Sequence, residues 1–283
     1  MITNNQNLPE VIVRAVSNDP YTKGKSDITV TQLIDSPRVV ALHKSHGDEI
    51  VEDAADRIWS LLGQSVHSVL ERAANEKDIV EERLYHEIMG WKLGGQFDLF
   101  SNGVLYDFKV TSVWKLVNLK NGTDPQWEAQ LNTLAWLMQM NGIQPERLAI
   151  VAILRDWSKH KAKETNYPSA QCVEIEIPMW SKAQQDEYIE RRIALHQRAQ
   201  DNAELMPECS REERWAKDDV FAVMKEGRKS ALKLYDNFDD ASAHALEDNK
   251  FHVEHRKGSS VRCESYCGVN KFCNQYQEEL TNG

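Results

Sequence analysis

We predict that this chain of 283 residues is an α/β protein with a central mixed sheet flanked by helices. Strand-like segments alternate with helical segments between residues 80 and 203, which is the pattern of an α/β layer. The pair Asn102-Gly103 separates two runs of strand formers and is the strongest short signal for a β-hairpin. The predicted regions are an irregular N-terminal segment at 1–47, the α/β core at 48–206, and a mostly helical, cysteine-bearing appendage at 207–283.

The composition is that of an ordinary soluble globular protein, with 41% hydrophobic and 28% charged residues. No apolar run is long enough to cross a bilayer. The N-terminal sequence MITNNQNLPE lacks the basic and then apolar pattern of a signal peptide. We therefore expect a cytoplasmic protein with no membrane partner.

The formal net charge is −10, the wrong sign for a protein that holds nucleic acid by overall electrostatic attraction. A role in binding nucleic acid therefore requires a local basic surface, and an ordinary solvated face is the alternative for each candidate. The candidates are Arg155 with Lys159, His160, Lys161 and Lys163, then Arg191-Arg192, and later Lys225 with Arg228 and Lys229.

The chain before the hairpin is expected to begin irregularly over residues 1–26 and to break at Pro37. From about Asp48 to Asn75, apolar residues recur at helical spacing with no intervening proline. His67 and Glu71 lie four apart on this helix and share one face, so they could reach a common metal or water. A surface His–Glu pair is the alternative. Residues 81–88 are expected to form the strand that leads into the hairpin.

The hairpin organises the candidate chemistry. If its turn has two residues, Asp98 lies opposite Asp107 and Gln96 lies opposite Lys109, with all four side chains on one face. Carboxylates that face each other across paired strands lie about 5 Å apart at Cβ and repel, so a divalent cation is the simplest group to offset the repulsion. A metal beside Lys109 suits phosphodiester hydrolysis. The alternative is a solvated face with a surface Asp/Lys pair.

A second helix is expected from Asp124-Pro125, a cap followed by proline at the first helical position, to the stop signal Asn141-Gly142. Gln130 stands at the edge of its buried stripe. There it could hydrogen-bond a catalytic residue or a phosphate, or simply pack beside the core. Cys172 is expected in the core because it alternates with apolar residues in a strand. The remaining elements are strands at 148–154 and 172–177, joined by a basic loop, and a helix at 180–203.

Three of the five cysteines, Cys263, Cys267 and Cys273, lie within eleven residues. An odd number of cysteines without a secretion signal argues against a disulfide framework and for a metal or cluster site. A tetrahedral site or a cubane cluster needs a fourth thiolate, for which Cys209 is the natural candidate because Cys172 belongs to a strand. Thiolates suit zinc and iron–sulfur alike, so the spacing leaves both open. Three unrelated free cysteines are the remaining alternative.

Taken in chain order, these motifs resemble the RecB-like branch of the PD-(D/E)xK nuclease superfamily. They span most of residues 60–275, and the resemblance implies a restriction-endonuclease-like core and a nuclease that acts on DNA. The motifs are GQSVH at 63–67, GGQFD at 94–98, DFK at 107–109, QWEAQLNTLAW at 126–136 and the late cysteines.

The resemblance also implies roles for individual residues. His67, Asp98, Asp107 and the backbone carbonyl of Phe108 would hold Mg²⁺ or Mn²⁺. Lys109 corresponds to the catalytic lysine, and Gln130 corresponds to the glutamine of the family's Gln-x₃-Tyr motif. Many members carry a [4Fe-4S] cluster on one distant cysteine and a C-terminal trio, which fits Cys209, Cys263, Cys267 and Cys273.

Three positions depart from the family's pattern. Phe97 stands where the eponymous proline is expected, and Leu134 occupies the position of the motif's tyrosine. Cys209 follows the nuclease core, whereas the isolated cysteine precedes it in the CRISPR-adaptation exonucleases of this group.

We therefore predict a Mg²⁺- or Mn²⁺-dependent DNA nuclease, an exonuclease on DNA ends or single strands, from bacterial or phage recombination, repair or replication. Its expected partners are DNA and a helicase or recombination protein. The metal would acidify a bound water, and Lys109 would orient that water or stabilise the transition state. The alternative is a catalytically silent DNA-binding or scaffold subunit that works beside a helicase, although the intact set of Asp98, Asp107, Lys109 and His67 argues against a decayed site.

Overall fold

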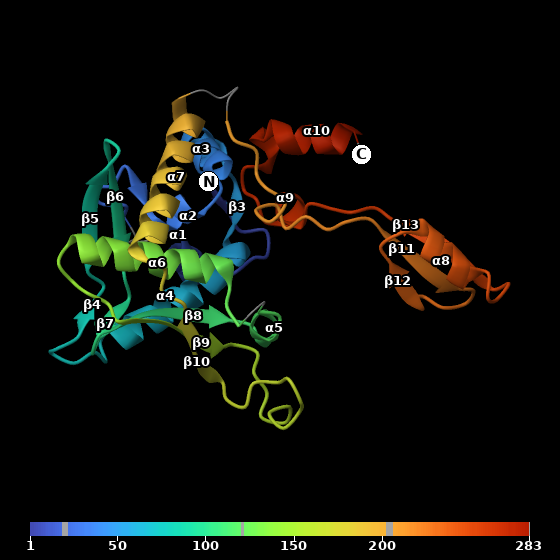
Figure 1. Ribbon diagram of the computed structural model, residues 1–283, viewed down its shortest axis with the longest axis horizontal. Coiled ribbons are helices and arrows are strands. Elements are labelled where there is room, and N and C mark those ends of the chain that lie inside the picture. The colour runs from blue at the N-terminus through green and yellow to red at the C-terminus, as the bar shows by residue number, and fades with distance from the viewer. Residues whose placement is uncertain (19–21, 120–121, 202–205, 283) are drawn as a thin grey trace. The chain divides into compact units, whose positions relative to one another are not determined.

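The computed structural model describes residues 1–18, 22–119, 122–201 and 206–282 (Figure 1). The chain divides into two compact units. The first comprises residues 1–41 and 48–206, and the second comprises residues 42–47 and 207–283. Within the described residues, none of the helices is both long and apolar enough to span a bilayer.

The first unit is built on a five-stranded mixed sheet, as predicted for the central sheet. Strands β8 and β9 are parallel, and the other neighbouring strands of this sheet are antiparallel (Figure 1). The sheet has the order β10-β9-β8-β7-β4. Its strands are β4 (Ile79–Val80), β7 (Leu99–Ser101), β8 (Val104–Thr111), β9 (Arg147–Leu154) and β10 (Cys172–Ile177).

The predicted hairpin joins β7 to β8. Asn102 and Gly103 both have positive φ angles, +49° and +79°, as a two-residue hairpin turn requires. Ser101 pairs with Val104, and the expected register holds as far as Leu99 opposite Tyr106. The prediction of this turn and register is confirmed over these pairs.

The expectation that Gln96 lies opposite Lys109 is wrong. The chain leaves the hairpin at Phe97, which is buried, and Gln96 ends strand β6 (Trp91–Gln96) in a second sheet. In that sheet Gln96 pairs with Arg83 of β5 (Arg83–Ile88). The other edge strand is β2 (Ile28–Thr29), giving the order β2-β6-β5.

Helices cover both faces of the main sheet. The predicted second helix is α6 (Pro125–Met140), whose N-cap residue Asp124 accepts hydrogen bonds from the amides of Gln126 and Trp127. It ends at Asn141, followed by Gly142 with φ +83°, as expected. Helix α6 packs against β5, β6, β8, β9 and β10, and α7 (Lys182–Asp201) packs against α6. Helix α4 (Ile58–Glu71) packs against β8.

Gly95 shows why the sequence needs glycine where α6 crosses β6. A Cβ atom at this position would lie 2.7 Å from the side chain of Val30 and 2.8 Å from that of Leu134. Any larger residue would therefore displace these side chains, which pack in the core. Leu134 is itself buried in the core.

The N-terminal residues are more ordered than expected. The prediction of an irregular segment over residues 1–26 is wrong where the structure describes it, because α1 (Glu10–Ser17) is helical. The segment after it was expected to break at Pro37, and this prediction is confirmed, because α2 (Val30–Ile34) ends before Pro37, which begins a new helix, α3 (Pro37–His46). The other elements here are β1 (Ile2–Thr3), η1 (Gly47–Glu49), β3 (Glu52–Asp53) and η2 (Ala54–Arg57).

Helix α4 begins at Ile58, whereas the sequence predicted a start near Asp48. The residues just before it form the separate 3₁₀ helix η2, which Asp53 caps by accepting a hydrogen bond from the amide of Ala55. Strand β3, which contains Asp53, pairs in parallel with β1.

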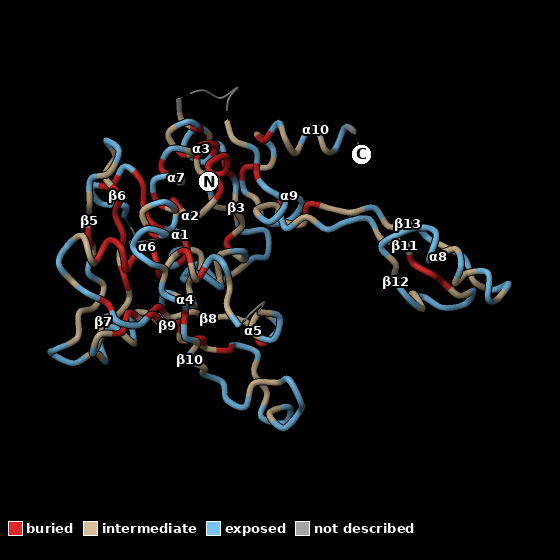
Figure 2. Tube along the Cα trace, viewed as in Figure 1, coloured by how far each residue is buried: buried red, intermediate tan, exposed pale blue. Residues whose placement is uncertain are grey.

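The core of the first unit lies between α6 and the two sheets (Figure 2). Its largest fully buried side chains include Phe97, Leu105, Leu131 and Leu148. Cys172 is exposed, so the expectation that it belongs to the core is wrong. On β10 it alternates with Val173 and lies on the exposed face of the strand.

The second unit contains the expected helices and an unexpected sheet. Three antiparallel strands with the order β12-β11-β13 pack against α8. The strands are β11 (Val220–Lys225), β12 (Lys233–Tyr235) and β13 (Phe251–Arg256). The helices are α8 (Phe238–Ala245), α9 (Val261–Ser265), η4 (Asn270–Phe272) and α10 (Asn274–Asn282).

Candidate active site

A candidate metal site lies where three segments of the first unit meet. His67 comes from α4, Glu81 precedes β5, and Asp98 lies at the corner between β6 and β7. One ligand atom from each of these residues lies within 4.8 Å of the other two. An imidazole and two carboxylates are a donor set that suits Mn²⁺ or Mg²⁺. Glu71, the expected companion of His67, does not belong to this group.

The imidazole of His67 is oriented from both sides. Its Nε2 lies 3.0 Å from the backbone oxygen of Phe108. Its Nδ1 lies 3.4 Å from Oδ1 of Asp98 and 3.9 Å from Oε1 of Glu81. When Nε2 carries the proton and donates it to the Phe108 carbonyl, Nδ1 presents a lone pair to the carboxylates. This arrangement leaves Nδ1 as the nitrogen that can bind a cation.

Without a cation, Nδ1 of His67 binds a proton instead. Hydrogen bonding to Asp98, then to Glu81, raises the pKa of His67 to about 10, and burial opposes the rise only in part. A cation that binds Nδ1 must displace this proton, because only the neutral imidazole is a ligand.

Asp98 joins the metal group to strand β8. Its Oδ1 faces His67, while its Oδ2 accepts a 2.7 Å hydrogen bond from the amide of Phe108. The neighbouring Phe97 is 1% exposed and anchors the corner in the core. The break between β6 and β7 therefore places the Asp98 carboxylate between His67 and the Phe108 amide.

Glu81 is a candidate site residue that the sequence did not predict. Its Oε2 accepts a 2.6 Å hydrogen bond from Nε2 of Gln96, and Gln96 in turn accepts one from Arg83. The missed signal is the second turn, at Met89-Gly90, where both φ angles are positive. Counting back from that turn along the β5–β6 pairing places Glu81 opposite Asp98.

A second group of side chains lies on the face of β8 that α6 covers. Asp107 Oδ1 accepts a 2.8 Å hydrogen bond from Gln130 Nε2, and Lys109 Nζ donates to Gln130 Oε1 at 3.1 Å. Lys109 Nζ also lies 2.7 Å from Asp107 Oδ2. The structure therefore brings Asp107, Lys109 and Gln130 together.

Burial of the Asp107 carboxylate is energetically unfavourable. It is 2% exposed, and among the described atoms its Oδ2 has an ion-pair contact but no hydrogen bond of suitable geometry. Burial raises the pKa of Asp107 to about 6, against the opposing attraction of Lys109. The charges of Asp98 and His67 also act on it, which places the two groups of side chains within electrostatic reach of each other. A buried acceptor in this position fits a cation ligand.

The four cysteines of the predicted cluster lie in the second unit. Cys209, Cys263 and Cys273 are buried and Cys267 is partly buried. Burial, followed by the nearby thiols of Cys267, Cys209 and Cys273, raises the pKa of Cys263 to about 11. The isolated Cys209 is tied to α10, because Gln275 accepts a hydrogen bond from its amide and donates one to its carbonyl.

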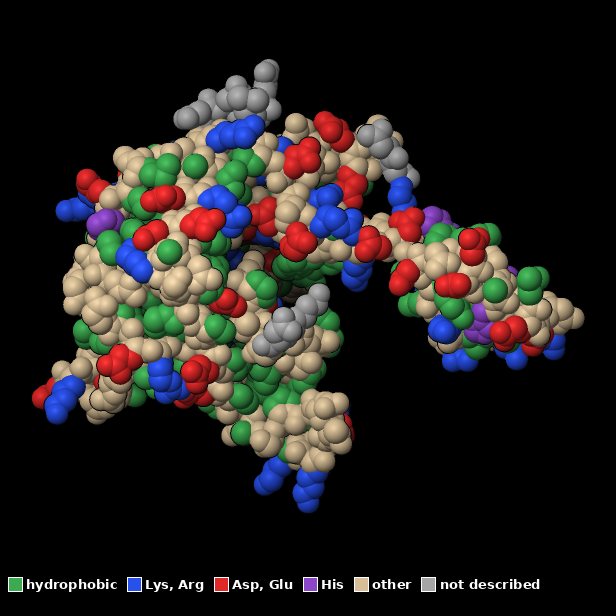
Figure 3. Space-filling view, in the orientation of Figure 1, with side chains coloured by type: hydrophobic (Ala, Val, Ile, Leu, Met, Phe, Trp, Pro, Cys, Tyr) green, Lys and Arg blue, Asp and Glu red, His purple; other side chains and the backbone are tan. Residues whose placement is uncertain are grey.

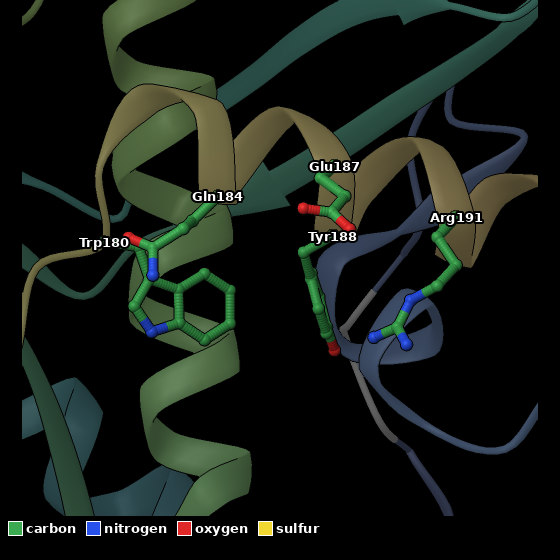
Figure 4. A pocket seen from close by; sticks show the side chains of 5 residues that line it. All are labelled: Trp180, Gln184, Glu187, Tyr188 and Arg191. Atoms are coloured by element: carbon green, nitrogen blue, oxygen red, sulfur yellow. The ribbon is translucent and has the colours of Figure 1, made fainter.

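A separate hollow of about 250 Å³ lies along α7 (Figure 4). The Trp180 and Tyr188 rings stand 5.0 Å apart in it. Trp180 Nε1 donates a hydrogen bond to Glu128 of α6. The residues that line this hollow include none of the predicted site residues.

The sequence matches no protein-family model, and no curated protein matches it. Among solved structures the chain is similar to the crystal structure of SSO0001, with 21% identity over 67% of this chain and 87% of that chain, and a TM-score of 0.46. It is also similar to an alkaline exonuclease, LHK-Exo, from Laribacter hongkongensis, with 16% identity over 62% of this chain and 88% of that chain, and a TM-score of 0.39. For the crystal structure of LHK-Exo in complex with dAMP, the identity is 16% over 63% of this chain and 89% of that chain, with a TM-score of 0.39. At TM-scores below 0.5 these similarities assign no function to this chain.

Proposed function

We propose that this chain is a metal-dependent deoxyribonuclease that hydrolyses phosphodiester bonds at DNA ends or in single strands. One observation carries the proposal. On β8, Phe108 contacts His67 and Asp98 through its backbone, while the adjacent Asp107 and Lys109 contact Gln130. Candidate cation ligands thus adjoin a buried carboxylate paired with a lysine.

His67, Glu81, Asp98 and Asp107 would hold Mg²⁺ or Mn²⁺. Bound there, the cation would polarise the scissile phosphate and make a coordinated water more acidic. Asp107 belongs to the proposed set because it is a buried carboxylate whose Oδ2 is paired with Lys109 but, among the described atoms, accepts no hydrogen bond of suitable geometry. The Phe108 carbonyl, implied as a further ligand, contacts Nε2 of His67 and in this arrangement orients the ring.

Lys109 would act on the substrate rather than on the cation. Its ammonium group is held by Asp107 and Gln130, and it is 27% exposed. From this position it would place the attacking water or offset charge that develops on the phosphate. Gln130, which hydrogen-bonds both side chains, would hold Lys109 and Asp107 in a fixed relative position.

Substitution of the central pair tests the proposal. Asp107→Ala and Lys109→Ala should each lower Mn²⁺-dependent cleavage of linear DNA by about a hundredfold or more, because each removes a group that acts mainly in the transition state. Glu71→Ala, at the exposed end of α4, is the matched control and should cleave normally. Near-wild-type cleavage by both central variants would contradict the proposal.

The same assay separates the nuclease from its rival. An inactive wild-type protein that still binds DNA would favour the silent DNA-binding or scaffold subunit. The resemblance to the RecB-like branch further suggests an exonuclease of bacterial or phage recombination, repair or replication, with a helicase or recombination protein as partner. These finer roles rest on the sequence motifs alone.

We also propose that Cys209, Cys263, Cys267 and Cys273 hold a [4Fe-4S] cluster, with a single zinc ion as the alternative. The mutual effect of the thiols on Cys263 and the clamp of Gln275 on Cys209 support this grouping. Protein purified without oxygen should contain iron and acid-labile sulfide, and Cys263→Ser should remove them. Cys172→Ser is the matched control, since Cys172 is exposed in the first unit. One tightly bound zinc would replace the cluster, and protein without metal would refute the site.

A further inference from the structure

An exposed tryptophan and an exposed arginine are stacked on each other beside the candidate active site. The guanidinium carbon of Arg155 lies 4.4 Å from the ring centroid of Trp59. Trp59 is nevertheless 59% exposed, so much of the ring remains open to solvent. An exposed cation–π pair contributes only about 0.5–1 kcal/mol to stability. Fold stability alone thus gives little reason to keep so large an apolar side chain in water.

The pair lies next to the strand that carries Lys109. Arg155 directly follows β9, and its amide donates a 2.9 Å hydrogen bond to the carbonyl of Thr111 at the end of β8. Thr111 stands two residues beyond Lys109 on the same strand. Trp59 lies on α4, the helix that carries His67, and eight residues at 1.5 Å each separate them by about 12 Å along the axis.

A second exposed tryptophan lies on the helix that directly follows β8, the strand whose last residue accepts the hydrogen bond from Arg155. Trp114 is 71% exposed on α5 (Val113–Val117). The first residue of that helix is fixed to the segment after β9, because the amide of Val113 donates a 2.7 Å hydrogen bond to Asp156. Figure 3 shows hydrophobic side chains on the surface around α5 and basic side chains that project from the β9–β10 loop below it. Lys159, Lys161 and Lys163 supply positive charge in that loop.

We propose that Trp59, Arg155 and Trp114 form a stacking platform for unpaired bases of the DNA strand that enters the active site. Nucleobases stack on aromatic faces and on guanidinium planes without regard to sequence, and basic side chains hold the phosphates between them. In duplex DNA the bases are already stacked on one another, so the platform selects single strands and frayed ends. The inference rests on the proposed nuclease function and names the residues that would select single strands and ends.

The position of the platform predicts which nucleotide of the substrate stacks on Trp59. A stacked strand advances about 3.4 Å per nucleotide, so 12 Å from His67 corresponds to about three or four nucleotides from the phosphate at the metal site. An extended strand would shorten this count. We therefore expect the base on Trp59 to lie two to four nucleotides from the bond that is cut.

Binding of a fluorescein-labelled oligothymidylate, measured by anisotropy in EDTA, tests the platform without cleavage. Trp59→Ala should weaken binding about fivefold or more, the lower range for loss of one base–aromatic stack, whereas Trp59→Phe should retain most of the affinity. Val69→Ala is the matched control, because Val69 is exposed on another face of the same helix. Arg155→Ala should also weaken binding, and Arg147→Ala, at the opposite end of β9, should do so much less.

A single abasic site moved along the oligonucleotide adds a double-mutant cycle. One position should weaken binding to the wild type by about the same factor as Trp59→Ala, and it should add no further loss in the variant. The platform is refuted if wild-type protein does not bind the oligonucleotide. It is also refuted if Trp59→Ala matches Val69→Ala, or if abasic sites act equally in wild type and variant.

Failure of the nuclease proposal is visible separately, as absence of Mn²⁺-dependent cleavage, while the binding measurements still report on the platform. A Trp59→Ala variant that binds and cleaves normally would instead remove the platform and leave the nuclease intact.

Discussion

Asp107 and His67 are the two residues whose environments shift their protonation most clearly within the first unit's candidate site. The pKa values of both are raised, to about 6 and about 10 respectively. In metal-free protein the native state therefore holds protons that the unfolded chain releases. In the absence of a bound cation, both side chains therefore resist deprotonation.

The stability of metal-free protein should consequently fall as pH rises. A raised native pKa means that the folded state binds more protons than the unfolded state, so the free energy of unfolding decreases with pH. The contribution of Asp107 to the free energy of unfolding is lost between pH 3.8 and about 6. The contribution of His67 is lost between pH 6.5 and about 10. Urea denaturation in EDTA at several pH values measures both windows. Asp107→Asn should flatten only the lower window, and stability that increases between pH 7 and 9 would contradict the assignment of His67.

Gln96 is predicted to position Glu81 rather than to bind metal itself. Gln96→Leu removes the hydrogen bond to Glu81, so we expect the dissociation constant for Mn²⁺ to rise about tenfold or more, with cleavage recovering at high Mn²⁺. Titration calorimetry measures the affinity. Gln64→Leu, on the exposed surface of α4, is the control. An unchanged Mn²⁺ affinity would make Gln96 merely structural.

Sequence reasoning identified most of these residues but not Glu81. Asp107 and Lys109 alternate on a strand, and their partner Gln130 lies on a helix with clear start and stop signals. Glu81 depends instead on the Met89-Gly90 turn, which lacks the Asn-Gly composition that marks the other hairpin. Its contact with the site could be obtained only by counting through both hairpins at once.

At the scale of elements, the β7–β8 hairpin sets the register of β8, the strand that carries Asp107 and Lys109. The carbonyl of Gly103 accepts hydrogen bonds from the amides of Glu146 and Arg147, which fixes the start of β9 to the turn. The turn therefore aligns both parallel strands beneath the site.

Gly103→Ala should destabilise the protein by about 1–2 kcal/mol, because alanine is strained at φ +79° and its Cβ would lie 3.1 Å from the Glu146 carboxylate. Asn102→Gly should be close to neutral, since glycine accepts a positive φ readily. Urea denaturation measures both variants. Equal stability of Gly103→Ala and wild type would show that the turn relaxes.

Elements with strong local signals were predicted and those that depend on tertiary context were not. Helix α6 carries its own cap and stop, and β9 is a continuous apolar run. The strand at Cys172 was identified correctly, but its exposed face was misassigned because the alternation there places cysteine beside glutamates. The sheet of the second unit was missed, since short polar strands such as β12 lack a clear period.

At the scale of the molecule, the acidic net charge of −10 must be reconciled with the proposed DNA substrate. Figure 3 shows basic and acidic side chains interspersed on the face in view, so attraction to DNA has to be local. The β9–β10 loop, in the same unit as the site, offers three lysines for this purpose.

We therefore expect linear DNA to be degraded faster than covalently closed circles, with activity that falls as salt rises. Replacing Lys159, Lys161 and Lys163 together with glutamine should raise KM with little change in kcat. It should also reduce the slope of log affinity against log salt by about two, at 0.7 per phosphate contact with a single strand. Lys92→Gln, on the β5–β6 hairpin, is the control. An unchanged slope in the triple variant would place the DNA path elsewhere.

The three-segment origin of the metal group has a mechanical consequence. A cation shared by His67, Glu81 and Asp98 would close two loops of the chain, as a reversible cross-link does. It would fasten α4 to the corner where the two sheets of the first unit separate. Losing the ion would therefore do more than stop catalysis, because that corner would also lose a tie and become easier for a protease to open.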